Sequence, residues 1–224
     1  MMARPARRGL RWKTGETFSL RVKGDLWVLG QMLVSPFMLF FNRFERFAEG
    51  PKWQEPPHAD EVLFPAAVTR QFLRFADLRR ETLPGIDYTP PTAWIAYHHG
   101  GRKVILWPGT EHERSTLVLS QRPGGRLFEQ HIGSGAGAPR PTLMAEIPLN
   151  DDATIDGHEL DVIRLFPNLN ERLYLCHIFG RNVDPEKDIT FDRELPSEYR
   201  TYVDIRSQHG SLEDWGYGDM RPPT

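Results

Sequence analysis

The sequence has very little cysteine: Cys176 is the only one among 224 residues. An intramolecular disulfide is therefore impossible, which excludes the small secreted folds that depend on disulfides and favours a reducing, cytoplasmic location. A free cysteine is commonly buried and unreactive. We therefore expect Cys176 in the core rather than in a catalytic pair with the adjacent His177, since neighbours in sequence point in different directions.

The chain also lacks a hydrophobic run long enough to span a bilayer. The apolar stretch Leu26–Phe41 covers about sixteen residues, whereas a membrane helix needs roughly twenty. Gln31, Ser35 and Pro36 interrupt it, and no small-residue cleavage pattern follows it. This pattern predicts two buried strands around a turn at Ser35–Pro36, with no membrane partner.

Motifs that assemble a recognised catalytic or cofactor site are missing as well. The sequence contains no lysine loop of the phosphate-binding type and no serine-hydrolase elbow. Gly133–Ala138 matches a dinucleotide-type glycine pattern, but Pro139 and Pro141 exclude the helix whose N-terminus would hold a phosphate. We interpret the stretch as a linker, and we assign no catalytic residue, no cofactor-binding residue, no metal ligand and no cofactor.

Histidines supply the main enzymatic alternative, a metal-dependent or histidine-based hydrolase. His98, His99, His112 and His131 fall at predicted strand ends or loops, where imidazoles could act as ligands or general bases. No spacing among them matches a known metal motif, because position 116, where a second histidine would be needed after His112, is Thr116. We favour ordinary loop histidines and a protein that is not an enzyme.

Composition favours a mainly β protein. The chain is 39% hydrophobic and 26% charged, as ordinary globular proteins are, and its 19 Gly and 19 Pro residues indicate many turns. We predict an α+β fold that is mainly β, with a strongly bent antiparallel sheet or a partly open barrel and one or two peripheral helices. The expected organisation is a disordered basic tail (1–9), a β-rich core domain (10–138) and an acidic C-terminal extension packed on that core (139–224).

The spacing of apolar residues along the chain predicts where the strands and helices lie. Alternation predicts a hairpin, apolar spacings of three and four predict a helix, and turn pairs predict a meander. The expected elements are a hairpin of Thr17–Val22 with Leu26–Val34, a helix over Pro65–Arg80, a meander of Ala93–His98, Lys103–Trp107 and Ser115–Ser120 followed by Arg126–Ile132, strands at Leu143–Leu149 and Tyr199–Ile205, and a polar loop at Asn150–Gly157.

Charge is distributed unevenly along the chain. Residues 1–23 hold seven Lys or Arg and one Glu, a balance of +6, whereas residues 151–224 hold sixteen Asp or Glu and eight Lys or Arg, a balance of −8. Negative surface potential attracts basic proteins. Within this region a run of acidic residues alternates with basic ones, as exposed faces often do, and we assign it as the partner-binding surface: Asp184, Glu186, Asp188, Asp192 and Glu194.

A dense group of aromatic residues offers another binding surface. Phe40, Phe41, Phe44 and Phe47 precede a proline-rich loop and could form an exposed apolar patch of an adaptor protein. A stacking platform for nucleic acid would also need a basic groove, so direct nucleic-acid binding is not expected.

The run Lys13–Phe41 resembles the opening of the immunity protein 26 family of bacterial polymorphic toxin systems. The positions that carry the resemblance are Gly15, Glu16, Phe18, Leu20, Gly24, Asp25, Trp27, Gly30 and Leu33. The resemblance implies a mainly β protein that binds a cognate toxin in the producer's cytoplasm and blocks it by surface occlusion. It brings no catalytic residues. If the toxin is a nuclease with a basic cleft, the acidic C-terminal third is suited to occupy it.

Overall fold

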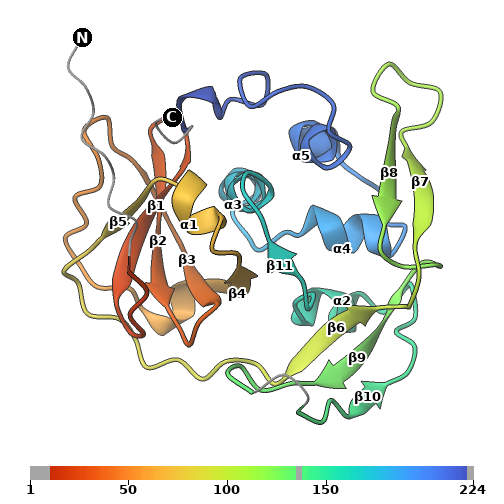
Figure 1. Ribbon diagram of the computed structural model, residues 1–224, viewed down its shortest axis with the longest axis horizontal. Coiled ribbons are helices and arrows are strands. Elements are labelled where there is room, and N and C mark those ends of the chain that lie inside the picture. The colour runs from red at the N-terminus through yellow and green to blue at the C-terminus, as the bar shows by residue number, and fades with distance from the viewer. Residues whose placement is uncertain (1–10, 135–137, 221–224) are drawn as a thin grey trace.

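The computed structural model describes residues 11–134 and 138–220, so the predicted tail 1–9 and part of the glycine stretch lie outside the described residues. The fold is mainly β, with 29% of residues in strands and 21% in helices, and its largest sheet is strongly curled. The predicted fold class is therefore confirmed. The curled sheet lies on one side of the molecule and the shorter strands on the other, with α3 and α4 between them (Figure 1).

The large sheet has six strands in the order β11-β4-β3-β2-β1-β5. It is antiparallel except where β11 joins β4. Its strands are β1 (Thr17–Lys23), β2 (Leu26–Met32), β3 (Phe37–Arg46), β4 (Val62–Val68), β5 (Leu78–Arg80) and β11 (Ile163–Arg164). The predicted hairpin is the β1–β2 pair, and the two strands expected around Ser35–Pro36 are β2 and β3.

Both faces of this sheet are buried. Phe18 and Phe40 pack edge to face, with ring centroids 5.9 Å apart, on the face covered by α3 (Asn168–Phe179). Gly30 lies opposite Phe18 in the β1–β2 register, and a side chain there would meet the Phe18 ring. Trp27 lies on the other face, in a second core cluster that also contains Trp94. Apolar residues on both faces explain why β2 has no polar alternation.

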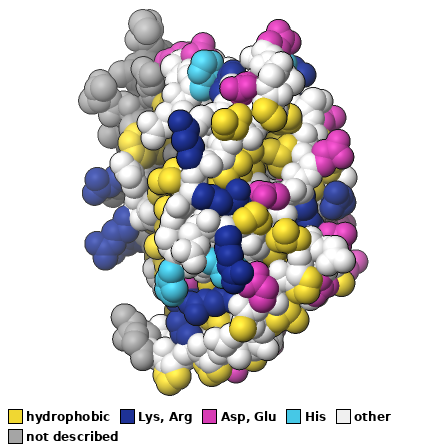
Figure 2. Space-filling view, turned by 90° about the vertical axis from the view of Figure 1, so that its right-hand side faces the viewer, with side chains coloured by type: hydrophobic (Ala, Val, Ile, Leu, Met, Phe, Trp, Pro, Cys, Tyr) yellow, Lys and Arg dark blue, Asp and Glu magenta, His cyan; other side chains and the backbone are white. Residues whose placement is uncertain are grey.

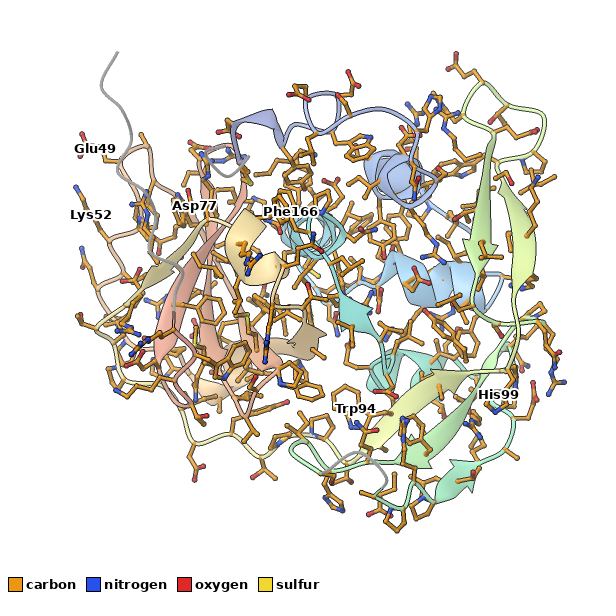
Figure 3. All side chains as sticks on the ribbon, in the orientation of Figure 1. Glu49, Lys52, Asp77, Trp94, His99 and Phe166 are labelled. Atoms are coloured by element: carbon orange, nitrogen blue, oxygen red, sulfur yellow. The ribbon has the colours of Figure 1, made fainter. Side chains whose placement is uncertain are left out.

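Three further strands form a small sheet in the order β10-β9-β6, and two more form a separate hairpin. These strands are β6 (Ala93–Tyr97), β7 (Arg102–Leu106), β8 (Arg114–Val118), β9 (Gly125–Glu129) and β10 (Thr142–Met144). The predicted meander is wrong in its pairing, because β6 pairs with β9 and leaves β7–β8 as an inserted hairpin. Trp94, labelled in Figure 3, contacts Phe37 of β3, with centroids 5.7 Å apart, and so joins the two sheets.

The helices are short, and most lie in the C-terminal part of the described chain. They are α1 (Phe72–Phe75), α2 (Asp152–Gly157), α3, α4 (Pro185–Thr190) and α5 (Arg200–Arg206), with 3₁₀ turns at Ala59–Glu61, Ser197–Tyr199 and Gly218–Met220. The core between α3 and the sheet includes Leu169, Leu173 and Cys176, all fully buried. The division of the chain between residues 138 and 139 stays a prediction.

Three local predictions are wrong for identifiable reasons. The expected helix over Pro65–Arg80 is instead β4, α1 and β5, because sheet pairing with β3 overrides the helical spacing. The expected strand Tyr199–Ile205 is a 3₁₀ turn and α5, and its buried residues Tyr199, Tyr202 and Val203 follow helical spacing. The expected loop Asn150–Gly157 contains α2, whose first turn is capped by Asp151.

Candidate functional site

A hollow with a volume of about 590 Å³ lies between β11, α5 and the end of β8. Its walls are apolar at Leu119, Ile163 and Leu165, and its floor is polar at Glu186 and Tyr202. A concave site with a few converging polar groups is the usual form of a binding pocket.

Glu186 is held at the floor of this hollow by three donors. The hydroxyl of Tyr97 donates to Oε1 at 2.8 Å, that of Tyr202 donates to Oε2 at 3.4 Å, and Nη1 of Arg206 lies 2.7 Å from Oε2. Burial, aided by the Glu186 carboxylate, raises the pKa of both tyrosines, so their hydroxyls stay protonated donors. Glu186 is thus fully engaged and buried.

Beneath Glu186 lies a network of buried ions, which we call the buried ion network: Glu159, Arg164, Arg172, Asp184 and Lys187. Arg164 and Arg172 share the carboxylate of Asp184, and Nη2 of Arg172 lies 2.8 Å from Glu159 Oε2. Lys187 donates to two backbone carbonyls, both at 3.0 Å. The charges are therefore paired or hydrogen-bonded, which is the condition for burying them.

The network keeps its carboxylates ionised. Burial alone would raise the pKa of Asp184, but Arg164 and Arg172 outweigh it and hold that pKa below its ordinary value. Burial acts in the same way on Glu159, where Arg172 and Lys187 hold the pKa low. Asp184 also accepts a hydrogen bond from the backbone N–H of Glu186 at 3.2 Å, and thereby caps α4. These contacts hold β11, α3 and the start of α4 together.

The structure corrects the prediction that the acidic run forms one exposed face. Asp184 and Glu186 are buried in the interactions just described, and Asp188 is largely enclosed by Tyr199 and Arg193. Alternating charges resemble a solvated face in sequence, but here the buried carboxylates Asp184 and Glu186 pair with arginines from other segments of the chain. Of the five assigned carboxylates, only Asp192 and Glu194 are exposed.

Asp192 and Glu194 line a second groove, of about 380 Å³, beside β7. Its opposite wall consists of consecutive residues from Val104 to Pro108, and Ile189 contributes to its lining. Nη2 of Arg102 lies 2.7 Å from Asp192 Oδ1, and the indole N–H of Trp107 donates to the Leu195 carbonyl at 3.1 Å. These contacts fix β7 and the segment after α4 relative to each other, so the groove is built into the fold.

Two bulky or charged residues of this groove have unusual backbone angles. Trp107 has φ 48° and Asp192 has φ 53°, in the left-handed region that favours glycine. Asp tolerates this conformation, but for tryptophan it is costly. Such conformations persist where the surrounding structure requires them, and here Trp107 follows the end of β7 and Asp192 follows the C-cap of α4.

The groove adjoins an acidic surface, which we define as Asp152, Asp156, Asp192 and Glu194. The single guanidinium of Arg193 contacts Asp152, Asp156 and Asp188, so three carboxylates share one cation. Asp152 and Asp156 remain largely exposed, with 74% and 58% of their side chains accessible. The result is an excess of negative charge next to the groove.

The β7–β8 hairpin exposes apolar side chains that the sequence reasoning missed. Ile105, Leu117 and Leu119 are 55%, 60% and 61% exposed. Figure 2, which looks onto the side carrying β7 and β8, shows hydrophobic side chains exposed between Lys and Arg. The arginines of β7, β8 and α5 are paired with carboxylates: Arg102 with Asp192, Arg114 with Asp204 and Arg206 with Glu186. The sequence signal for this exposed surface was the pair of apolar runs Val104–Leu106 and Leu117–Leu119, which lie along the two arms of the hairpin.

The structure does not bring the candidate histidines together. Nε2 of His98 lies 3.3 Å from Glu146, that of His112 lies 3.2 Å from Glu111, and that of His131 lies 3.2 Å from Glu129. His99 lies at the turn after β6 (Figure 3). Within residues 11–134 and 138–220, no three His, Cys, Asp or Glu side chains are grouped as a metal site requires.

Two other predictions are resolved by burial. Cys176 is buried as predicted, and burial raises the pKa of its thiol to about 11, so it is an unreactive core residue. The prediction of an exposed aromatic patch is wrong, because Phe40 and Phe41 are fully buried. Phe44 packs on His177 and Phe47 on Trp53, each at 5.2 Å between ring centroids.

No helix in the described part of the chain has both the length and the apolar character that crossing a membrane requires. In the comparisons with known proteins, no family model, curated protein or solved structure matches this chain.

Proposed function

We propose that this chain is an immunity-type binding protein that neutralises a basic toxin protein in the producer's cytoplasm by covering its working surface. The observation that carries the proposal is the groove beside β7, which the exposed carboxylates Asp192 and Glu194 line together with the exposed apolar residue Ile105. Leu117, on the paired strand β8, adds to the exposed apolar surface of the hairpin. Protein interfaces combine such apolar contact area with complementary charge at the margin.

Two further features support this proposal. The opening hairpin resembles that of a toxin-immunity family, and three of the residues that carry the resemblance have structural positions: Gly24 at the β1–β2 turn, Gly30 against Phe18, and Trp27 in the core. Glu186 at the floor of the larger hollow, and Asp184 beneath it, are already paired with cations or tyrosines. The acidic surface, by contrast, retains carboxylates with excess charge for a partner.

A bacterial growth assay tests the proposal. The toxin-type protein encoded next to this chain would be produced in a bacterial host with and without the chain. We expect growth only when the chain is present, and a stable one-to-one complex of the two purified proteins. If the toxin arrests growth equally in both cultures and no complex forms, the proposal is wrong.

A charge variant tests whether Asp192 and Glu194 belong to the surface that binds the partner. Replacing Asp192→Asn together with Glu194→Gln should weaken the complex at least tenfold. The matched control is Glu45→Gln with Glu55→Gln, which removes the same charge from exposed positions elsewhere on the molecule. Equal affinity of both variants would contradict the assigned surface.

A further inference from the structure

The β7–β8 hairpin leaves one strand edge without a neighbour. In the described part of the chain, β8 is the only strand that pairs with β7. An unpaired edge presents backbone N–H and C=O groups that can pair with another extended chain. Proteins often protect such an edge with charged side chains, and here Lys103 is the one such residue in the middle of β7.

The contact of Arg206 shows which groups of β7 face outward. Nη2 of Arg206 donates to the Leu117 carbonyl at 2.7 Å, so this carbonyl points away from β7. In an antiparallel pair, residues that face each other either exchange both backbone hydrogen bonds or exchange none, in alternation. Lys103, which faces Leu117, and Ile105, two residues further on, therefore turn their N–H and C=O groups to the free edge.

The groove runs along this edge. Side chains of a strand alternate between its faces, yet the consecutive β7 residues Val104, Ile105 and Leu106 all line the groove, as do the two residues that follow the strand. It is therefore the backbone edge of β7, rather than one face, that borders the hollow. Asp192 and Glu194 line the same groove on the other side.

We propose that β7 binds an extended segment of the partner as an added β-strand, and that this segment alternates basic and apolar residues. The proposal rests on the proposed function and specifies its mode of contact. Main-chain hydrogen bonds to Lys103 and Ile105 supply the pairing. Side chains on one face of the added strand meet Asp192 and Glu194, which favours Lys or Arg, and those on the other face extend the apolar surface of Ile105 and Leu117. At about 3.3 Å per residue, the five residues of β7 accommodate a segment of similar length.

Peptide probes test this mode directly. The probe is an acetylated heptapeptide in which lysine alternates with valine, and the matched control has glutamate in place of every lysine. Amide hydrogen exchange of the full chain is followed by NMR. We expect the lysine peptide to slow exchange of the Lys103 and Ile105 amides at least tenfold, and the glutamate peptide to leave them unchanged.

Variants separate backbone pairing from side-chain contact. Ile105→Pro removes the outward N–H without removing a hydrogen bond to β8, and should abolish the protection at position 103. Ile105→Thr keeps the N–H and should retain the protection at position 103. Circular dichroism and thermal unfolding show whether the proline variant stays folded. If it unfolds, a lysine peptide N-methylated at alternate residues replaces it, and should bind at least tenfold more weakly than the unmethylated peptide.

The outcomes distinguish this proposal from the function on which it rests. Protection by both peptides, by neither, or only at residues away from β7 overturns strand addition. Light scattering that shows the isolated chain to be a dimer, with the Lys103 and Ile105 amides already protected, also overturns it, because a second copy then occupies the edge. If the growth assay succeeds while β7 stays unprotected in the toxin complex, strand addition fails and the proposed function stands. If the lysine peptide protects β7 but the growth assay shows no rescue, strand addition stands and the proposed function fails.

Discussion

The core around the large sheet and the core around α4 are stabilised by different means. Between the sheet and α3 the core consists largely of apolar side chains, as in the edge-to-face packing of Phe18 on Phe40, with Asn170 adding hydrogen bonds to β1 carbonyls. Around α4, by contrast, Arg164, Arg172 and Asp184 are buried together. Truncating an apolar contact costs transfer and cavity energy, whereas removing one partner of a buried ion pair leaves a charge that is no longer fully compensated. The two regions should therefore respond differently to substitution, pH and salt.

The largest expected effect is in the buried ion network. Arg172→Met leaves Glu159 and Asp184 without a shared cation, and removes the guanidinium that lies 3.6 Å from the Phe64 ring centroid. Breaking a buried pair in this way costs about 3–5 kcal/mol of unfolding free energy. Urea unfolding measures the loss. Arg181→Met, at an exposed position nearby, should change stability by less than about 0.5 kcal/mol. Equal effects of the two variants would contradict the network's role.

The apolar core should show a smaller effect through crowding. Gly30→Ala places a methyl group against the Phe18 ring and 2.9 Å from the Leu39 carbonyl. Overpacking of this kind costs about 1–3 kcal/mol. Gly157→Ala is the control, because a methyl group there meets no atom within 4 Å. Denaturant midpoints should fall for the first variant and not for the second, and a fall in both would show that crowding at Phe18 is not the cause.

Acid should weaken the region around α4 selectively. The pKa values of Glu159 and Asp184 are held low in the folded chain, so the unfolded chain binds more protons. Their stabilisation is therefore complete above their ordinary pKa values near 4 and is lost as the pH falls through the folded values. Urea midpoints of the native chain should decline from pH 5 towards pH 3. Glu159→Gln should make that decline shallower, and an unchanged slope would count against this source of acid sensitivity.

The smallest stability effect is expected at the exposed carboxylates. Asp192→Asn with Glu194→Gln should alter the free energy of unfolding by about 1 kcal/mol or less, because the Arg102–Asp192 pair is partly exposed. The same variant should slow association with the toxin severalfold at low ionic strength, and the difference should shrink in high salt. Stopped-flow mixing measures both rates. A difference that persists unchanged in high salt would show that charge steering is not its cause.

The same contrast explains what the sequence could predict. The β1–β2 hairpin was predictable because Phe18, Leu20 and Val22 alternate and Gly24 lies at the turn, all within a few residues. The network was not, because Arg164 and Asp184 are twenty residues apart and alternating charges suit an exposed face equally well. The helix α5 was missed since Tyr202, Val203 and Ile205 favour strands in isolation and become helical through burial. The groove depends on a meeting of β7 with the segment after α4 that no local pattern specifies.

In the proposed function, the side of the molecule that carries β7 covers a basic partner. Hydrogen-exchange mass spectrometry of the chain alone and in complex with the proposed toxin partner measures which surface is covered. We expect slowed exchange in segments covering residues 102–108 and 189–195. Slowed exchange confined to the large sheet, with these two segments unchanged, would contradict it.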